Sequence, residues 1–323
     1  MKRTIDNQTF NINGELITSY KNGNYTVELY DDGTKIRFGE EPFKPEFPES
    51  MDVCITKCCD GGCPFCYENC TIDGKHGTIL LRNGDDISLP YWMQNLHSGT
   101  ELAMNGNDLS HPDLIDCLRL LKTNGVIVNL TVNQKHFEKH WDSLYLMQMA
   151  NLIHGIGISI EDSSSESLHK LIGLFDNVVL HTIAGILTVE DIINLQALKP
   201  KILILGYKNV GRGIKYKKQF EDSINSNIEE LKLNLKLMQQ YFDVISFDNL
   251  ALNQLDVKNV LFNNDEEKWS KFYMGDDGGF TMYIDTVSGK YSKNSCVLYK
   301  ERYKITKRMT VEDMFNDIKQ KYA

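Results

Sequence analysis

Long apolar stretches are missing from this sequence of 323 residues, of which 41% are hydrophobic and 24% are charged. No run approaches the ~20 apolar residues that a membrane-spanning helix needs, so we expect no membrane partner. The first residues, Met1-Lys-Arg-Thr-Ile, carry two basic side chains but no apolar segment of a secretory signal. We therefore expect a cytoplasmic protein.

Positive charge is also in short supply, because 35 Lys and Arg stand against 44 Asp and Glu, giving a net charge of −9. Binding to phosphate backbones regardless of sequence needs a basic face, so this balance disfavours nucleic acid as a partner. Cysteine is scarce outside one stretch, since only Cys117 and Cys296 lie beyond residue 70. Six cysteines within residues 54–70 favour metal binding in a reducing compartment over a disulfide framework.

From residue 51 onward, short apolar strands alternate with amphipathic helices, which predicts β/α units around a parallel sheet. We expect buried strands, such as Ile202-Leu-Ile-Leu205, as parallel sheets require. The predicted strands are 52–56, 101–105, 126–131, 155–160, 177–183, 201–205 and 244–247. The predicted helices are about 85–97, 112–123, 136–149, 165–175, 189–198 and 226–241.

The two ends of the chain do not follow this alternation of strands and helices. Residues 1–50 predict a strand-rich extension with turns at Asn22-Gly23 and Asp31-Asp-Gly-Thr34, and then a proline-rich linker over 39–50. The extension either caps one end of the core or contacts a partner. After residue 250, the segments 280–285 and 290–291 predict a second hairpin, and 311–322 predicts a terminal helix.

The stretch Cys59-Asp-Gly-Gly-Cys63-Pro-Phe-Cys66 places three thiols at x3 and x2 spacing. Thiolates are soft ligands that select iron–sulfur clusters, zinc or copper(I). A four-iron cubane normally takes four cysteines, so three would leave one iron open to another ligand. Gly61 and Gly62 allow the loop to turn tightly. A zinc knuckle and a set of free thiols are the alternatives.

This stretch resembles the signature of the radical S-adenosylmethionine (SAM) superfamily, Cys-x3-Cys-x-aromatic-Cys, with Phe65 in the aromatic position. His111-Pro-Asp-Leu114 is similar to the Leu-x-His-Pro-Asp-Leu that often follows the second strand of that family. The preceding turn departs from the family's Gly-Gly-Glu-Pro, because Asn105-Gly106-Asn107-Asp108 stands there. The resemblance covers about residues 51–250. It implies a partial TIM-type (β/α)6 barrel with an N-terminal hairpin extension (1–50) and a C-terminal hairpin and helix (251–323).

The resemblance also implies an activity. Cys59, Cys63 and Cys66 would ligate a [4Fe–4S] cluster whose open iron takes the amino and carboxylate groups of SAM. An electron from a flavodoxin- or ferredoxin-type donor would cleave SAM into methionine and a 5′-deoxyadenosyl radical. That radical would abstract a hydrogen atom from a substrate, for which a peptide or small molecule is favoured.

Further candidate residues stand at predicted strand ends, where ligand sites of such barrels form. Lys208 and Arg212, in a loop with three glycines, are candidate anion-binding groups in catalysis, and a solvated basic loop is the alternative. Cys296 is a candidate hydrogen-atom donor to a product radical, and His181 is expected to be a core histidine. The resemblance implies cofactor contacts for Phe65, Tyr67, Asn105, Gly106, Asn107, Asp108, Asn133, Ser159 and Gly185.

Two other functions stay open at this point. The first is a non-catalytic interaction protein that binds zinc or an iron–sulfur cluster with a closed fourth ligand such as Cys58 or Cys70. The second is a fold that still binds SAM or a nucleotide but has lost radical chemistry, which the departure at 105–108 makes conceivable.

Overall fold

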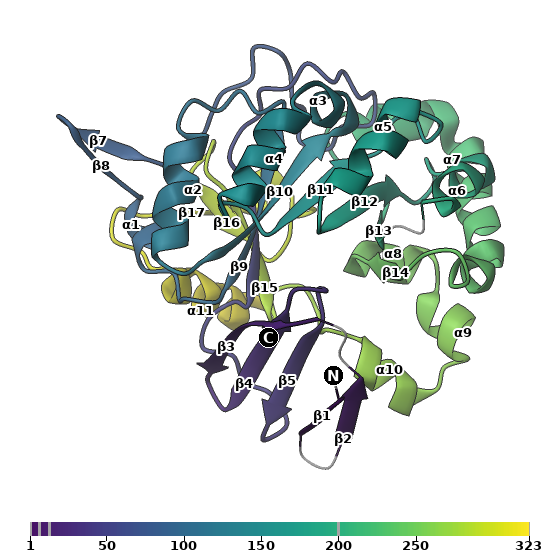
Figure 1. The fold of residues 1–323 in the computed structure, drawn as a ribbon, viewed down its shortest axis with the longest axis horizontal. Helices are drawn as coiled ribbons and strands as arrows, with labels where there is room; N and C mark the ends of the chain where they lie inside the picture. The colour runs from purple at the N-terminus through teal and green to yellow at the C-terminus, as the bar shows by residue number, and fades with distance from the viewer. Residues whose placement is uncertain (1, 6–7, 12–13, 199–200, 323) are drawn as a thin grey trace.

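A ten-stranded, mostly parallel sheet forms the centre of the computed structural model (Figure 1). The structure describes residues 2–5, 8–11, 14–198 and 201–322; positions 1, 6–7 and 12–13 of the predicted extension, with 199–200 and 323, lie outside. The strand order is β14-β13-β12-β11-β10-β9-β6-β15-β16-β17. The strands are β6 (Ser50–Cys54), β9 (Glu101–Asn107), β10 (Ile127–Asn133), β11 (Gly155–Ser159), β12 (Val178–Ile183), β13 (Lys201–Leu205), β14 (Val244–Phe247), β15 (Thr281–Asp285), β16 (Lys290–Ser292) and β17 (Tyr303–Lys304).

From β6 to β14, each parallel strand pairs with the next strand of this sheet along the chain. All seven strands predicted for the core are therefore confirmed, with ends that shift by up to two residues. The sheet does not close, because β14 and β17 form its two edges. The protein is thus a mixed α/β fold with an open central sheet.

Helices α2 to α7 flank the parallel strands (Figure 1). The helices are α1 (Tyr91–Gln94), α2 (Leu114–Thr123), α3 (Gln134–Lys139), α4 (Trp141–Met149), α5 (Glu166–Leu171), α6 (Val189–Gln196), α7 (Arg212–Met238), α8 (Asn249–Gln254), α9 (Val257–Phe262), α10 (Glu266–Phe272) and α11 (Val311–Tyr322), with short 3₁₀ turns at Ile172–Leu174 and Tyr299–Glu301. Within the described ranges, no helix is both long and apolar enough to cross a bilayer.

Three helix predictions need correction. The helix predicted over 85–97 is wrong: a hairpin of β7 (Leu81–Asn83) and β8 (Asp86–Ser88) precedes the single turn of α1. Its turn is Asn83-Gly84, with Gly84 at φ +63°, an Asn-Gly signal that the helix prediction overlooked. The predicted helix 136–149 is divided at His140. The helix predicted from 226 begins at Arg212 and contains a break at Phe220 (φ −128°, ψ 29°).

Burial alternates along the central strands. In β9 and β13, Leu102, Met104, Ile202 and Ile204 are buried in the core that includes residues of the flanking helices, while the residues between them are partly exposed. In these two strands, the prediction of buried strands therefore holds for one face only. In β11, by contrast, the first four of its five residues are all buried.

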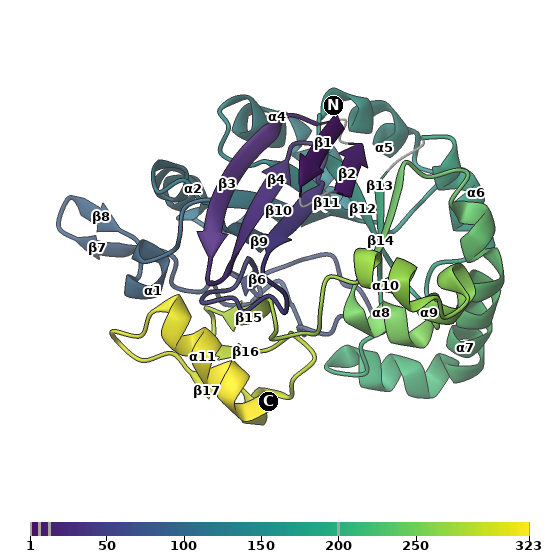
Figure 2. The same cartoon turned by 90° about the horizontal axis from the view of Figure 1, so that it is seen from below.

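The N-terminal strands form a separate antiparallel sheet that lies across one end of the central strands (Figure 2). It comprises β3 (Leu16–Asn22), β4 (Tyr25–Tyr30) and β5 (Lys35–Gly39), and a hairpin of β1 (Lys2–Ile5) and β2 (Gln8–Asn11) precedes it. Both predicted turns are present. Arg37 pairs through two nitrogens with Glu49, just before β6, at 2.7 and 3.0 Å. Lys35 pairs with Glu101, the first residue of β9, at 2.5 Å. These contacts support the predicted capping role.

The C-terminal segment contributes to the same central sheet. The predicted hairpin is confirmed as β15 and β16, and the terminal helix as α11. An unpredicted feature is that β15 runs parallel to β6, with Tyr283 opposite Asp52. Residues beyond 250 therefore extend the sheet on the side of the cysteine motif.

Candidate functional site

The cysteine loop follows β6 at the carboxyl edge of the sheet, and two asparagines of β9 hold its beginning. Asn105 accepts a hydrogen bond from the Ile55 N–H (2.6 Å) and donates to the Thr56 carbonyl (2.9 Å). Asn107 donates to the same carbonyl (3.1 Å) and to that of Cys58 (3.3 Å). Both predicted cofactor residues therefore lie at the loop and bind its backbone.

Arg212, at the start of α7, braces the other half of this loop. Its Nε donates to the Cys63 carbonyl (3.1 Å) and its Nη1 donates to the Cys70 carbonyl (2.8 Å). The Arg212 backbone N–H also donates to the Cys66 carbonyl (3.1 Å). The preceding Gly211 has φ +58°, and a Cβ there would lie 2.4 Å from the Tyr67 carbonyl oxygen. The guanidinium predicted to bind an anion is thus engaged in positioning the cysteine loop.

Two further strand ends contact the tip of the loop. The Cys63 thiol donates to Glu161 Oε1 (3.4 Å), just after β11, and that oxygen also accepts from Asn133 Nδ2 (2.5 Å) at the end of β10. In α3, His136 Nε2 lies 2.5 Å from Asp60 Oδ1. Together with Asn105, Asn107 and Arg212, these contacts join the loop to four other parts of the sheet edge.

The three thiols of the motif differ in the direction in which the structure shifts their pKa values. All three are partly exposed. The pKa of Cys66 is lowered to about 6, chiefly by a hydrogen bond with the Cys70 thiol and also by backbone hydrogen bonds from Cys70 and Glu68. Burial and the Glu161 carboxylate raise the pKa of Cys63 to about 12, and burial raises the pKa of Cys59. Coordination to a metal would deprotonate each thiol.

The donor set fits an iron–sulfur cluster. Backbone hydrogen bonds to the Cys66 sulfur are of the kind that tune cluster potentials. Gly61 packs closely against the motif, because a Cβ there would lie 3.3 Å from Cys59 Sγ and 3.2 Å from Asn133 Nδ2. In a cubane, each thiolate binds a separate iron atom, so the ligands surround a volume. Within the described residues, no three His, Cys, Asp or Glu side chains converge to hold a single metal ion.

Asn133 and Ser159, two predicted cofactor contacts, stand next to each other at the carboxyl edge. They pair in register across β10 and β11, and Ser159 in turn pairs with His181 of β12. The Asn133 side chain also caps α3 by accepting from Lys135 N–H (3.0 Å). The structure therefore brings these two residues to one row beside the cysteine loop.

Three other predicted cofactor residues have local structural contacts. A Cβ on Gly106 would lie 3.0 Å from the Leu130 side chain, and one on Gly185 would lie 2.7 Å from Ile224 of α7. Close packing therefore favours glycine at Gly106, and Gly185 also has φ +85°, which favours glycine. Asp108 Oδ1 accepts from the Ser110 hydroxyl (2.6 Å) and backbone N–H (3.1 Å). Because α2 begins at Leu114, Asp108 lies outside the first turn of that helix.

Lys208 connects the cysteine loop with the C-terminal segment. Its ammonium lies 4.1 Å from the centre of the Tyr67 ring and donates to Ser295 Oγ (2.8 Å). The next residue, Cys296, is partly exposed, and burial raises the pKa of its thiol. Phe65 makes an edge-to-face contact with Tyr216 of α7, with ring centroids 5.6 Å apart. The structure thus gathers Tyr67, Lys208 and Cys296, which the sequence places far apart.

Two titratable side chains lie at exposed or partly exposed positions of the central sheet. Asp52, in β6, is exposed, yet loss of hydration raises its pKa, which Lys208 opposes. His181, in β12, is partly exposed, yet loss of hydration and the charge of Lys208 lower its pKa to about 4. Water therefore reaches both groups, although protein surrounds them. His181 is not the core histidine that we predicted.

Sequence reasoning missed Glu161, Asp60 and His136 as members of the site. Glu161 stands at a strand end, and that position was the only signal for it. Asp60 and His136 are 76 residues apart, so only the fold reveals their contact. No protein-family model and no curated protein matches the chain.

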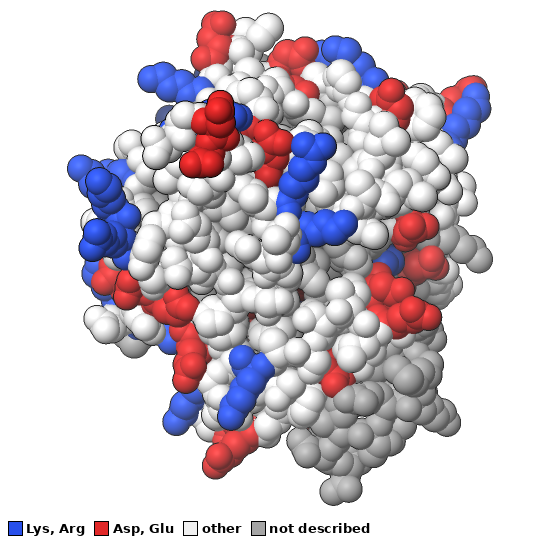
Figure 3. Space-filling view, turned by 60° about the vertical axis from the view of Figure 1, so that its left-hand side comes forward, with Lys and Arg blue, Asp and Glu red and all other residues white. Residues whose placement is uncertain are grey.

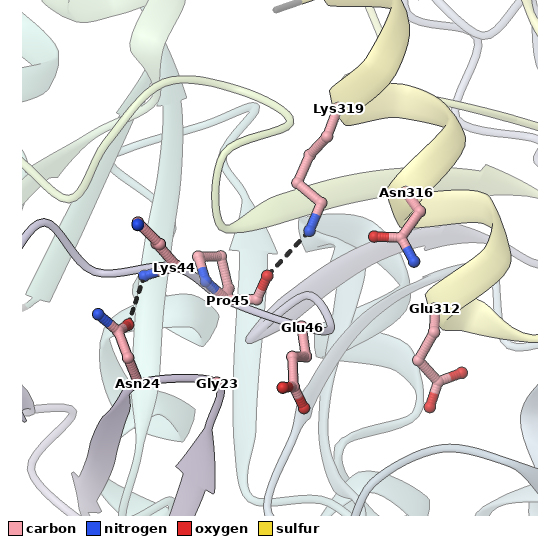
Figure 4. Close-up of a pocket in the computed structure, with 8 residues that line it drawn as sticks. All are labelled: Gly23, Asn24, Lys44, Pro45, Glu46, Glu312, Asn316 and Lys319. Atoms are coloured by element: carbon pink, nitrogen blue, oxygen red, sulfur yellow. Dashed lines mark hydrogen bonds between the residues drawn. The ribbon is translucent and has the colours of Figure 1, made fainter.

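One pocket lies away from this site. It has a volume of about 570 Å³ and is formed by the β3–β4 turn, the linker and α11 (Figure 4). Lys319 Nζ donates to the Pro45 carbonyl (2.9 Å) across it. None of its lining residues belongs to the cysteine loop or to the strand ends around that loop, so we assign it no part in the chemistry below.

Proposed function

We propose that this protein is a radical SAM enzyme, built on a partial (β/α)6 barrel. One observation carries the proposal. The loop with Cys59, Cys63 and Cys66 lies at the carboxyl edge of a parallel sheet, where Asn105 and Asn107 of β9, Glu161 after β11 and Arg212 of α7 contact it. That edge is where parallel β/α folds place their ligands.

Each side chain around the loop then has a definite task. Arg212 and Asn107 hold the loop backbone, so that the three sulfurs keep their relative positions. Asn133 and Ser159 present polar groups for the ribose or carboxylate of SAM. When bound, a [4Fe–4S] cluster supplies the electron that cleaves SAM and so provides the radical for hydrogen abstraction. The protein's contribution is positioning, tuning and the exclusion of water.

Polar groups on the central sheet support a peptide or small-molecule substrate. The side chains of Asp52 and His181 have no hydrogen-bond partner within the described part of the chain, and Lys208 offers one cation between the Tyr67 ring and Ser295. On the face shown in Figure 3, acidic and basic side chains are scattered around a wide uncharged area and form no continuous basic stripe. That surface does not favour nucleic acid as the substrate.

Anaerobic reconstitution with iron and sulfide tests the proposal. The wild-type protein should bind iron and sulfide in equal amounts and should form 5′-deoxyadenosine from SAM when dithionite is added. Cys63→Ala should lose both properties, whereas Cys117→Ala, which removes a buried thiol outside the motif, should keep them. A colourless wild-type protein that binds zinc would contradict the proposal.

A closed metal site with four thiolates is the second candidate, because the Cys70 thiol lies in hydrogen-bond contact with Cys66. The same reconstitution separates the two. If the site keeps an open iron, Cys70→Ala retains its iron and its SAM cleavage. If Cys70 is the fourth ligand, that variant loses its metal together with Cys63→Ala.

A further inference from the structure

Four charged side chains, two cations and two carboxylates, meet where the cysteine loop adjoins β15. Lys57 Nζ lies 3.3 Å from Glu68 Oε2 and 3.1 Å from Asp285 Oδ2. Arg302 Nη1 lies 3.3 Å from the same Asp285 oxygen. Glu68 and Asp285 are both buried, and the Arg302 side chain is only 8% exposed. We call Lys57, Glu68, Asp285 and Arg302 the charge tetrad, whose formal charges cancel.

Two members of the charge tetrad flank the cysteine motif on either side. Lys57 stands two residues before Cys59, and Glu68 stands two residues after Cys66. Two residues span at most about 7 Å of backbone, so both side chains start close to a cysteine of the motif. Glu68 Oε1 also accepts a hydrogen bond from the Tyr283 hydroxyl (2.6 Å) in β15. The charges nearest to the motif are therefore held in place by the central sheet.

The remaining two members hold the network from the side of the C-terminal segment. Asp285 lies two residues after Tyr283 in β15 and accepts from the Ser288 backbone N–H (3.0 Å) through its other oxygen. Arg302 Nε donates to the Val297 carbonyl (2.9 Å), and its Nη2 donates to that of Ser295 (2.9 Å). The tetrad therefore has fixed positions on both sides of the motif.

Burial makes the balance of these charges important. A buried charge is costly unless an opposite charge compensates it, so each member of the tetrad depends on its partners. An uncompensated charge in a site poor in water also acts on a neighbouring metal centre more strongly than it would in solvent. Net charge is one of the factors that set the potential of an iron–sulfur cluster. Because reduction adds one negative charge, a neighbouring anion disfavours it and a neighbouring cation favours it.

We propose that the charge tetrad sets the reduction potential of the metal centre at the cysteine loop. Lys57 and Glu68 are its main positioning residues, because they stand nearest to the motif in the chain. This inference rests on the proposed function, since it needs a cluster that changes its redox state. While all four charges are present they cancel, and removal of either sign leaves a net charge beside the motif.

A tetrad with a purely structural role would behave differently. A network that only fastens the cysteine loop to β15 would lose stability when any one of its members is neutralised. The cluster potential would then not depend on the sign of the charge that is removed. The sign of the shift in potential therefore separates an electrostatic role from a structural one.

The test compares charge-neutralised variants of the reconstituted full-length protein. Lys57→Met removes a cation, Glu68→Gln removes an anion with little change of shape, and the double variant removes both. An anaerobic redox titration, followed by absorbance and by electron paramagnetic resonance of the reduced cluster, gives the midpoint potential. Urea titration of each protein gives its stability, and dithionite-driven formation of 5′-deoxyadenosine gives its activity.

The two single variants should shift the potential in opposite directions. Lys57→Met should lower it, because Glu68 and Asp285 then outnumber the remaining cation, and Glu68→Gln should raise it. Each shift should correspond to at least about a tenfold change in the equilibrium constant of one-electron reduction, which is about 59 mV. The double variant should return to within about threefold of the wild-type constant.

Arg37→Met and Glu49→Gln are the matched controls. Arg37 and Glu49 also form a pair, 2.7 Å apart and largely shielded from solvent, but Glu49 lies just before β6. The five residues of β6, about 17 Å of strand at about 3.3 Å per residue, separate Glu49 from the start of the cysteine loop. Both control variants should lose stability and keep the wild-type potential.

Each other outcome has a distinct meaning. If the wild type forms no cluster, or no 5′-deoxyadenosine with dithionite, the proposed function fails, and the tetrad inference fails with it. If the wild type is active but both single variants keep its potential or shift it in the same direction, only the tetrad inference is overturned. Should Lys57→Met or Glu68→Gln not fold, Arg302→Met and Asp285→Asn replace them with the same expected signs. Loss of the cluster in all four would show that the tetrad only supports folding, which also overturns the inference.

Discussion

Replacing Arg212 with methionine should loosen the cysteine loop without unfolding the protein. The substitution keeps most of the side-chain volume but removes the hydrogen bonds to the Cys63 and Cys70 carbonyls, at 3.1 and 2.8 Å. Hydrogen bonds that involve a charged group each contribute about 1.5–3 kcal/mol. Because Arg212 remains partly exposed, we expect a loss of about 2–4 kcal/mol in the free energy of loop opening.

Hydrogen exchange of the metal-free protein measures this loss directly. The amides of Cys66 and Asn69, which bond to carbonyls within the loop, should exchange roughly 30- to 700-fold faster in Arg212→Met. Arg119→Met is the control, because Arg119 forms only an exposed pair with Asp116 within α2. If Arg212 were an anion-binding group with no part in the loop, exchange would stay within about threefold of wild type. That result would refute the bracing role.

Two further predictions concern stability away from the loop. Because the folded state lowers the pKa of His181 to about 4, the unfolded chain binds its proton more tightly, and stability is lost as pH falls from about 6.5 towards 4. Urea titrations should therefore show that wild type loses about 1–2 kcal/mol more than His181→Gln between pH 7.5 and pH 5, and identical losses would contradict this. Arg37→Met leaves the buried Glu49 carboxylate without its main partner, so we expect about 3 kcal/mol of destabilisation with normal iron loading. A loss below about 1 kcal/mol in the free energy of unfolding, measured by urea titration, would show that Lys35 compensates.

The sequence predicted the central sheet well, because local patterns determine it. Apolar runs bounded by turns marked all seven core strands, and the hairpins at both ends carried Asn-Gly, Asp-Gly or Ser-Gly signals. The same type of signal at Asn83-Gly84 was overlooked in favour of a helix. The start of α7 was missed because Gly211 and Gly213 suggested a loop. Gly213 is in fact buried, and a Cβ there would lie 2.4 Å from the Lys208 carbonyl oxygen, so the close approach of the backbone favours glycine.

In the candidate site, too, local features could be predicted from the sequence and long-range contacts could not. The spacing of its three cysteines is local, and the sequence displays it. The partners of those cysteines are not local: Arg212 lies 149 residues from Cys63, and Glu161 lies 98 residues from it. From the sequence, Arg212 in a glycine-rich loop was predicted to bind an anion. Only the fold shows that its Nε and Nη1 donate to backbone carbonyls of the cysteine loop instead. Residue types alone therefore predicted candidate ligands but not the groups that position them.

The departure of the Asn105–Asp108 turn from the family pattern has a physical explanation in these contacts. Asn107 must donate to two carbonyls, those of Thr56 and Cys58, and an ionised glutamate could only accept. Asn107 also has φ +47°, a conformation that asparagine tolerates better than glutamate does. Among the described residues, its Oδ1 accepts a hydrogen bond only from Asn105 Nδ2, at 3.5 Å, and so keeps the capacity to accept from an ammonium group. The amide can therefore secure the cysteine loop with one end and receive the amino group of SAM with the other, which makes the substitution compatible with the proposed chemistry.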